Sequence, residues 1–301
     1  MGQVVNPVTL EKGLRAEFMK AYSSQEDSAI ISAAMKVNSS AASEKFGWLG
    51  SAPMMQEFKD EKVPKGLLDF NYTVTNVPYE ATIKVDKFTL RNDQLGAVQV
   101  RVRDLAARAR VFPIKLLVDL LVAGSSQLCY DGQAFFSASH SEGSSGTQSN
   151  LLSGSGVTTS ALATDFRAAR AKMLGYLDDQ GQPMFEDIAG QDLLVVCNPA
   201  MQGVFEELFN ASMISNTSNV LKGAAQVAVT SRLSDTNDWY LLNRGGAVKP
   251  LILQENMPVE FGALEGQSDE GFKRRFYLYG VEWYGNVGYG LWQKAVKTTN
   301  S

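Results

Sequence analysis

A chain of 301 residues is long enough to bury a large core, in one elaborate domain or in two. Its composition, 45% hydrophobic and 20% charged, is ordinary for a soluble globular protein. The formal net charge of -4 gives no reason to expect a dedicated nucleic-acid surface, and no apolar run approaches the length of a membrane span.

Residues 1–45 are predicted to form a weakly hydrophobic N-terminal arm. Leu10, Leu14, Phe18 and Tyr22 recur every four residues, which is the spacing of one face of a short amphipathic helix. These residues are too few to form a core alone, so the helix either docks on its own domain or packs on a neighbouring subunit, and we favour the neighbour. The opening sequence has no basic region followed by an apolar core, so we expect no secretory signal and a protein that stays inside the cell that makes it.

The region 46–85 is predicted to contain extended, paired strands. Apolar and polar residues alternate from Tyr72 to Val85, on either side of Pro78. A two-stranded ribbon is only marginally stable in water by itself. We therefore expect another element to cover the face that carries Ile83 and Val85, from either the same subunit or the next one.

The stretch 93–124 is predicted to be a long helix that serves as the spine of the fold. Pro113 lacks an amide proton and its ring blocks the preceding turn, so we expect the helix to bend or restart there. Gly124 suits a helix end. If helical throughout, the stretch would span roughly 45 Å. Small and apolar residues share one of its faces: Val98, Val102, Leu105 and Ala109.

The remainder of the chain indicates an α+β protein with segregated helices and strands. Asp131-Gly132 predicts a tight turn among aromatic residues, and 141–160 is a long polar loop. A helix from Leu162 to Leu177 is expected to close at residues 178–181, and Asn198-Pro199 predicts the start of another. Short strands are predicted at 193–196, 227–230, 239–242, 251–254 and 259–261, with a long one at 272–284.

His140, the only histidine, is the first candidate for catalysis. A serine hydrolase would use it as the base, with Ser137 or Ser139 as the nucleophile and Asp131 as the orienting carboxylate. However, no GxSxG elbow occurs in the chain, and both serines lie in a serine-rich loop. The sequence therefore favours a structural histidine and predicts no catalytic residue.

Metal and cofactor sites find little support. One histidine and two distant cysteines, Cys129 and Cys197, give no zinc-ligand spacing. Each cysteine lies in an apolar stretch, so two buried thiols in a reducing compartment are favoured over a disulfide between them. The acidic pairs Asp178-Asp179 and Glu206-Glu207 fit a turn and a solvated helix face. The dinucleotide fingerprint and the P-loop are both absent. No metal and no cofactor are predicted.

Several short motifs follow one another in a definite order along residues 46–295. They are Phe46-Gly47-Trp48-Leu49; the ribbon residues Tyr72, Asn76, Tyr79-Glu80, Thr82-Ile83 and Val85; Asn92-Asp93 and Gly96; Tyr130-Asp131-Gly132-Gln133 with Phe135-Phe136 and His140; Ser149-Asn150; and Asn286-Val287-Gly288-Tyr289-Gly290-Leu291-Trp292-Gln293. Each motif is weak alone, but the ordered set resembles the major head (capsid) subunits of Mu-like tailed bacteriophages, which have the Hong Kong 97-type capsid fold. Residues 1–45 lie outside this resemblance.

The resemblance implies a division of the α+β fold into five parts. These are an N-terminal arm (1–45), an extended β-hairpin loop (46–85), a peripheral domain with the spine helix (86–186), an axial domain (187–259), and C-terminal strands that return to the peripheral domain (260–301).

The resemblance also implies a function and partners. Subunits of this kind assemble with themselves, as hexamers and pentamers, into the icosahedral head of a tailed phage. That head encloses double-stranded DNA without sequence-specific binding. The implied partners are a scaffolding protein, a portal and a decoration protein, with no membrane. We expect the protein in the virion capsid, after assembly in the host cytoplasm.

Two groups of residues follow from this interpretation. Contacts between subunits are expected at large apolar side chains of the arm and the extended loop: Leu10, Leu14, Phe18, Phe46, Trp48, Tyr72, Val74, Tyr79, Ile83 and Val85. A structural role is expected for the motif residues Tyr130, Asp131, Gly132, Gln133, Phe135, Phe136, His140, Gly288, Tyr289, Gly290 and Trp292. Two alternatives stay open: a bacterial nanocompartment shell protein of the same fold, which would enclose enzyme cargo, and a cytoplasmic hydrolase that uses His140 and a nearby serine.

Overall fold

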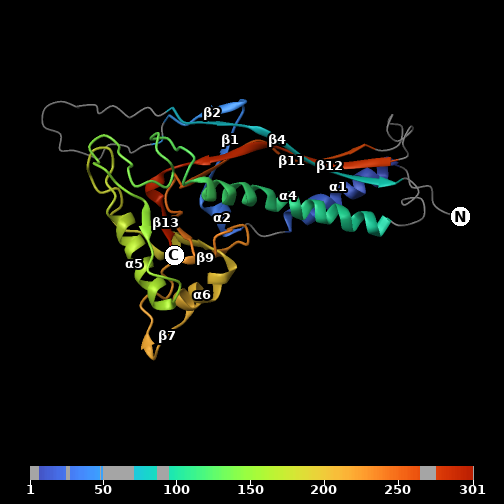
Figure 1. The fold of residues 1–301 in the computed structure, drawn as a ribbon. Helices are drawn as coiled ribbons and strands as arrows, with labels where there is room; N and C mark the ends of the chain where they lie inside the picture. Colours follow the sequence, from blue (N-terminus) through green and yellow to red (C-terminus); the bar gives the residue numbers. More distant parts are fainter. Residues whose placement is uncertain are drawn as a thin grey trace.

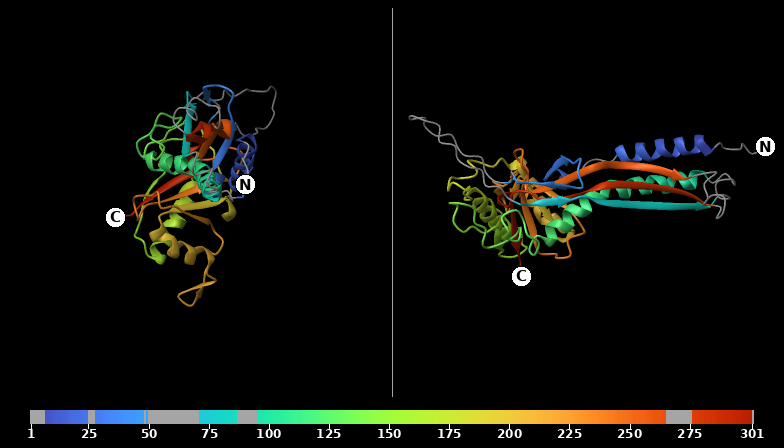
Figure 2. Two further views of the ribbon diagram at one scale, coloured as in Figure 1. Left: turned by 90° about the vertical axis from the view of Figure 1, so that its right-hand side faces the viewer. Right: turned by 90° about the horizontal axis from the view of Figure 1, so that it is seen from above.

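The computed structural model describes residues 7–24, 28–47, 49, 71–86, 95–264 and 276–300. They form an elongated layer of strands and two long helices, which extends away from a second part built on its own sheet (Figure 1). Figure 2 shows the long helices and strands running alongside one another. The expected α+β class is confirmed. Over the described residues, no helix combines the length and apolarity needed to cross a membrane.

The elongated layer contains a four-stranded sheet in the order β1-β11-β12-β4. Strands β11 (Leu251–Leu264), β12 (Phe276–Tyr289) and β4 (Val77–Asp86) are antiparallel, and β1 (Ala34–Asn38) is parallel to β11. The sequence predicted two separate strands where β11 lies. The structure has one strand whose register shifts on both sides of Met257, because bulges absorb the break in the alternating pattern.

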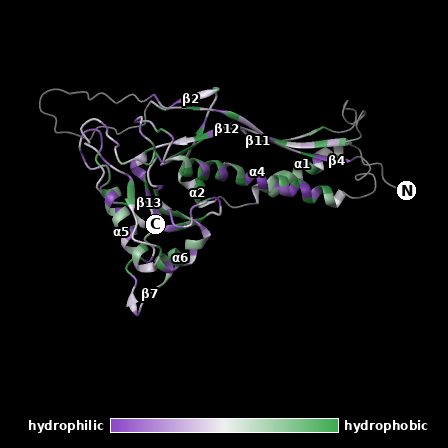
Figure 3. Ribbon diagram, viewed as in Figure 1, coloured by the Kyte–Doolittle hydropathy of each residue, from purple (hydrophilic) through white to green (hydrophobic). Residues whose placement is uncertain are grey.

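One face of this long sheet is covered by two helices of the same chain, α4 (Leu95–Ala123) and α1 (Pro7–Ser23). The Phe18 ring of α1 stacks on Phe261 of β11 at a centroid distance of 5.1 Å. Figure 3 shows hydrophobic and hydrophilic residues alternating along α4, as expected for a helix with one buried face. Val85 is buried in the same cluster, so its cover comes from the same chain.

The spine helix lies where the sequence predicts it. The helix α4 contains Pro113 and continues on both sides of it as a single element, so of the bend or restart predicted there, the restart does not occur. A proline removes only one donor from the hydrogen-bond ladder. Val102 in the first half and Leu117 in the second are both fully buried, so tertiary packing holds the two halves.

The two-stranded ribbon predicted between Tyr72 and Val85 was wrong in its pairing. Strand β3 (Thr73–Thr75) pairs with β2 (Ser43–Lys45), and β4 pairs with β12. Only Asn76 separates β3 from β4, which is too short a connection for the chain to reverse. The buried Asn76 amide instead donates hydrogen bonds to Ser39 Oγ (3.0 Å) and Ala41 O (2.8 Å).

The second sheet has five strands in the order β5-β13-β10-β6-β9. Every residue of the central strands β6 and β10 is buried, which agrees with the continuous apolar runs in their sequences. The strands and helices of this part are β5 (Leu151–Ser153), β6 (Leu193–Cys197), β9 (Gln226–Val229), β10 (Trp239–Asn243), β13 (Ala295–Thr299), α5 (Thr159–Leu174) and α6 (Gln202–Asn210).

Helix boundaries in this part follow their caps. The Asn198 side chain accepts a hydrogen bond from the Ala200 amide, which confirms the predicted N-cap. Helix α5 ends at Leu174 with Gly175 as its C-cap, so the prediction that it continues to Leu177 was wrong. The remaining elements are a short helix α2 (Ala29–Ser32), the hairpin β7 (Met213–Ile214) with β8 (Thr217–Ser218), and single 3-10 turns η1 (Gly190–Asp192), η2 (Pro199–Met201) and η3 (Trp292–Lys294).

Docking of the arm helix α1 depends on one aromatic anchor. The substitution Phe18→Ala should weaken docking by about 3–5 kcal/mol, because a fully buried ring is lost and a cavity remains. Limited proteolysis and hydrogen exchange should then show faster cleavage and exchange within residues 7–24. The control Met19→Ala removes a side chain that is 48% exposed on the same helix and should change neither. Equal protection in both variants would contradict this role of Phe18.

Candidate functional site: a buried junction of two motifs

Two motifs 150 residues apart in sequence meet in the core of the second part. The His140 ring stacks on the Trp292 ring with centroids 4.0 Å apart and an interplanar angle of 3°. Phe135 stacks on Tyr289 at 4.4 Å and 16°. All four rings are buried. We call this contact between residues 129–142 and residues 288–293 the motif junction.

A hydrogen-bonded acid orients His140 within the motif junction. His140 Nδ1 lies 2.6 Å from Asp131 Oδ2, and the Cys129 thiol donates to Asp131 Oδ1 at 3.0 Å. Burial alone would raise the pKa of the Asp131 carboxyl, but the hydrogen bonds from His140 and Cys129 leave that pKa below its ordinary value. Gly132, at φ +79°, supplies the left-handed conformation that the predicted tight turn requires.

A second buried acid, Glu142, ties the two motifs together. Its Oε1 atom accepts hydrogen bonds from the Tyr130 hydroxyl (2.6 Å), Trp292 Nε1 (2.6 Å) and Gln293 Nε2 (2.9 Å). Burial raises the pKa of the Glu142 carboxyl although these donors act in the opposite direction. This role is not predictable from the sequence, because Glu142 lies in a serine-rich loop that resembles a solvated segment.

The chain passes closely at the glycines of the C-terminal motif. A Cβ atom at Gly290 would lie 2.0 Å from the Lys249 carbonyl oxygen, and one at Gly288 would lie 2.5 Å from a methyl group of Val74. Real Cβ atoms do not approach other atoms so closely, so both positions exclude a side chain. These contacts bring the C-terminal motif against β3 and the segment that leads into β11.

The residues around His140 do not form the Ser-His-Asp triad of a hydrolase. In a catalytic triad, one histidine nitrogen bonds the carboxylate and the other bonds the nucleophilic hydroxyl. His140 Nδ1 has its acid, but the buried Nε2 has no hydrogen-bond partner among the described residues. The hydroxyls of Ser137 and Ser139 lie 3.2 Å from each other, and Ser139 also donates to Gln133. The geometry supports the structural interpretation of His140.

Among the described residues, one group of side chains brings metal-ligand atoms close together. Ligand atoms of Cys129, Asp131 and His140 all lie within 4.8 Å of one another. The spacing of histidine and cysteine alone does not predict this group, because Asp131 supplies one of its three ligand atoms. Burial strongly raises the pKa of the Cys129 thiol, with Asp131 adding to the shift, so the thiolate that a metal requires is disfavoured. The group is better described as a hydrogen-bonded cluster that fixes the 129–140 loop.

Most residues expected at contacts between subunits are covered within one chain. Leu14, Phe18 and Val85 are buried between the long sheet and its helices, and Phe46 and Val74 are buried in the main core. Tyr79 stacks on Trp283, and the Tyr72 hydroxyl accepts a hydrogen bond from the Tyr289 amide. Ile83 is half-buried, whereas the side chains of Leu10 and Trp48 lie outside the described residues. A role of these residues between copies stays a prediction.

The buried Glu142 carboxyl predicts a specific pH dependence. Because its pKa is raised in the folded protein, its contribution to stability is greatest at acidic pH and is lost as the pH rises through the folded pKa. Glu142→Gln keeps an oxygen acceptor and removes the ionisable group. Urea unfolding should therefore show the variant gaining stability relative to the wild type between acidic and mildly alkaline pH.

The control for this experiment is Glu206→Gln, which changes an exposed acid on α6. It should leave the pH profile of unfolding unchanged. Asp131 is present in every variant, so its own contribution cancels in the comparison. If the free energies of unfolding of the wild type and of Glu142→Gln change in parallel with pH, ionisation of Glu142 does not destabilise the folded protein and the prediction is wrong.

The family model described as Mu-like prophage major head subunit gpT matches residues 8–165 and 231–301. The chain is 25% identical over 264 residues to the major capsid protein of Escherichia phage Mu, which covers 87% of this chain and 64% of that protein. It is 22% identical over 260 residues to the Mu-like prophage FluMu major head subunit of Haemophilus influenzae, covering 86% and 62%. The chain thus spans less than two thirds of the length of either relative.

Solved structures share the fold. The procapsid of bacteriophage JBD30 matches with a TM-score of 0.61 and 23% identity, covering 99% of this chain and 77% of the other. The virus-like particle from Pyrococcus furiosus matches with a TM-score of 0.56 and 11% identity, covering 96% and 98%. At these identities the likeness establishes the fold. The family model, in contrast, matches well over half of the sequence, and the chain belongs to the family of the Mu-like prophage major head subunit.

Proposed function

We propose that this chain is the major capsid protein of a tailed double-stranded DNA phage and that its copies assemble into the icosahedral head around the genome. The observation that carries the proposal is the family match over residues 8–165 and 231–301. The likeness of its α+β fold to phage procapsid and capsid chains supports it. Membership in a head-subunit family favours a structural role over an enzymatic one, in agreement with the incomplete triad at His140.

The architecture of the long sheet suits repeated contacts between copies. On β12, Tyr279 and Val281 are buried under α1 and α4. They alternate with Leu278, Gly280 and Glu282, which are half-buried or exposed. One broad face of the sheet is thus covered by helices, while the other offers partly exposed residues along its length. Many modest contacts on such surfaces add up to a stable closed assembly.

We carry over the five-part division of the chain with one adjustment. The arm (1–45), the extended loop (46–85) and the peripheral domain (86–186) keep the boundaries expected from the sequence. Strand β11 begins at Leu251 and belongs entirely to the long sheet, so we place the end of the axial domain between Asn243 and Leu251 rather than at residue 259. The strands β6, β9 and β10 then form the centre of the axial domain.

The proposed partners are further copies of the chain, in hexamers and pentamers, together with a scaffolding protein and a portal. A decoration protein is proposed because the JBD30 capsid is decorated with minor capsid protein trimers. The enclosed double-stranded DNA would be bound without sequence specificity, which suits a net charge of -4. The site of action is the virion capsid, after assembly in the host cytoplasm.

A nanocompartment shell is the second candidate function, because the virus-like particle from Pyrococcus furiosus has the same fold. The family match distinguishes the two candidates, since it points to phage head subunits. The contents of the particles also distinguish them. A head encloses nucleic acid together with a portal, whereas a nanocompartment encloses folded enzymes.

Electron microscopy and light scattering test the proposal directly. The chain, expressed alone and with its neighbouring genes, should form closed particles of megadalton mass, and particles from phage-producing cells should contain nuclease-protected DNA. A stable monomer under every assembly condition would contradict the shell function. Particles that contain an enzyme and no protected DNA would favour the nanocompartment.

A further inference from the structure

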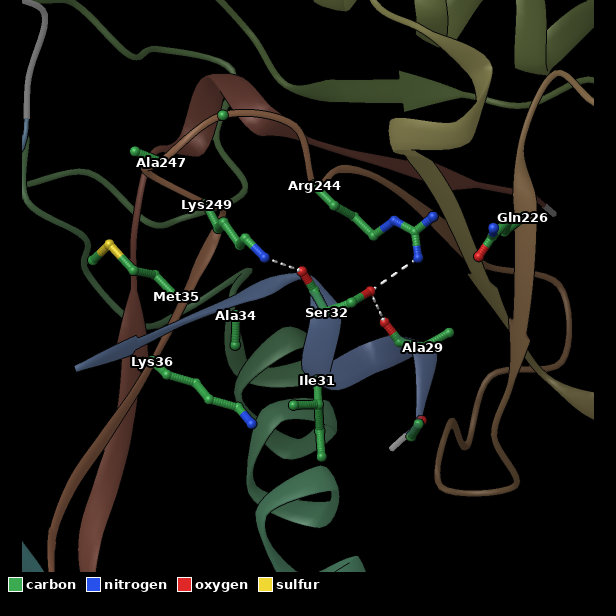
Figure 4. A pocket seen from close by; sticks show the side chains of 12 residues that line it. Ala29, Ile31, Ser32, Ala34, Met35, Lys36, Gln226, Arg244, Ala247 and Lys249 are labelled. Atoms are coloured by element: carbon green, nitrogen blue, oxygen red, sulfur yellow. Dashed lines mark hydrogen bonds between the residues drawn. The ribbon is translucent and has the colours of Figure 1, made fainter. Parts of the chain in front are cut away.

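A basic pocket of about 680 Å³ lies where the two sheets meet. Lys36 from β1, and Arg244 and Lys249 from the segment between β10 and β11, line it together with Ser32 of α2. Figure 4 shows Arg244 and Lys249 approaching Ser32 from different sides, with Lys36 on the neighbouring strand. None of the described side chains that line the pocket is acidic.

Within the pocket, Arg244 and Lys249 are held by neutral oxygen atoms; the charge of Asp192, which does not line the pocket, opposes the lowering of the Arg244 pKa by burial. Arg244 Nη1 donates to Ser32 Oγ at 2.9 Å, and Lys249 Nζ donates to the Ser32 carbonyl at 2.8 Å. Burial lowers the pKa of the Lys249 ammonium, and the charges of Arg244 and Lys36 lower it further. Among the described residues, Lys36 is exposed and forms no hydrogen bond or ion pair. An anion in this pocket would remove the mutual repulsion of the three groups.

The shape of the pocket selects the kind of anion. Ile31 and Met35 contribute apolar surface beside the charged groups, so the pocket suits a short carbon stem that ends in a charge. Arg244 and Lys249 are half-buried, so an acid on a flexible side chain can reach them more readily than a phosphate on the backbone of a rigid duplex. An Asp or Glu side chain on another polypeptide has both the short carbon stem and the terminal negative charge that the pocket requires. The chain itself carries 32 acidic against 28 basic residues, so each copy can supply such a group.

We propose that the pocket formed by Lys36, Arg244 and Lys249 binds a carboxylate side chain of a second copy of this chain. The proposal rests on the proposed shell function, which brings copies into contact. Its structural consequence follows from the position of the pocket. The bound carboxylate would hold strand β1 of the long sheet, and the short helix α2 before it, against the segment that connects β10 to β11. It would thereby fix the two sheets relative to each other.

Zero-length cross-linking tests this contact in assembled particles. A carbodiimide activates a carboxylate, a neighbouring lysine amine attacks the activated carbonyl, and an amide forms as a urea leaves. Particles assembled from an equal mixture of isotopically light and heavy protein should yield peptides that join Lys36 or Lys249 to an Asp or Glu. Pairs of mixed isotope composition should be among them, because the two residues come from different copies.

Other outcomes overturn the proposal without affecting the shell function, which electron microscopy of the same particles reports. Links only between peptides of equal isotope composition would place a carboxylate of the same chain in the pocket. Links to a different protein would make that protein the occupant. If other lysines are linked and Lys36 and Lys249 are not, no carboxylate occupies the pocket. If packaged DNA protects both lysines from chemical modification, the occupant is a phosphate.

Substitutions provide an independent readout. Lys36→Gln should lower the NaCl concentration at which particles dissociate, because one of the attractive charges is lost, whereas Lys36→Arg should retain the wild-type midpoint. Lys172→Gln removes a lysine of α5 that lies outside the pocket and serves as the matched control. Light scattering during a salt titration measures all four proteins. Equal midpoints for Lys36→Gln and the wild type would contradict the proposal.

Discussion

The close backbone contact between Gly290 and Lys249 holds the two sheets of this protein together. Strand β12 of the long sheet leads through Gly290 to β13 of the second sheet, and β10 of the second sheet leads through Lys249 to β11 of the long sheet. The amide of Gly290 donates to the carbonyl of Pro250 at 2.8 Å, and that of Leu291 donates to Lys249 at 3.2 Å. Only a glycine permits this approach, because a Cβ atom would overlap the Lys249 carbonyl. Gly290 belongs to the motif junction and Lys249 lines the basic pocket, so the two sites share this crossing.

Local patterns predicted most elements of the fold and few of their pairings. The spine helix, the buried strands β6 and β10 and the cap at Asn198 follow from periodicity and side-chain chemistry within a few residues. The partners of β3 and β4 could not be predicted in this way, because each pairs with a strand far away in the sequence. Pro113 also shows that local patterns do not account for tertiary packing. The proline favours a break, but the packing of both helix halves outweighs it.

The candidate site was predicted in part for a similar reason. The motif residues Asp131 and His140 stood out in the sequence, and their structural interpretation follows once Trp292 is seen stacked on the imidazole ring. Glu142 did not stand out, because nothing near it in the sequence indicates burial. The arm presented a different problem. An apolar stripe such as Leu14 and Phe18 predicts that a face is covered but does not say which chain covers it, and here the same chain does.

The acids of the motif junction and the cations of the basic pocket differ in whether partners of the same chain balance their charges. In the motif junction, Glu142 Oε1 receives three hydrogen bonds from fixed donors and Asp131 receives those of His140 and Cys129, so both acids are bound by donors of the same chain. In the basic pocket, Ser32 offers only neutral oxygen atoms to Arg244 and Lys249. Neutral acceptors orient cations without compensating their charges; Asp192 acts on Arg244 from outside the pocket, whereas only cations shift the pKa of Lys249 beyond the effect of burial. The motif junction therefore stabilises the single subunit, and the basic pocket is where an anion from outside the described chain has the most to contribute.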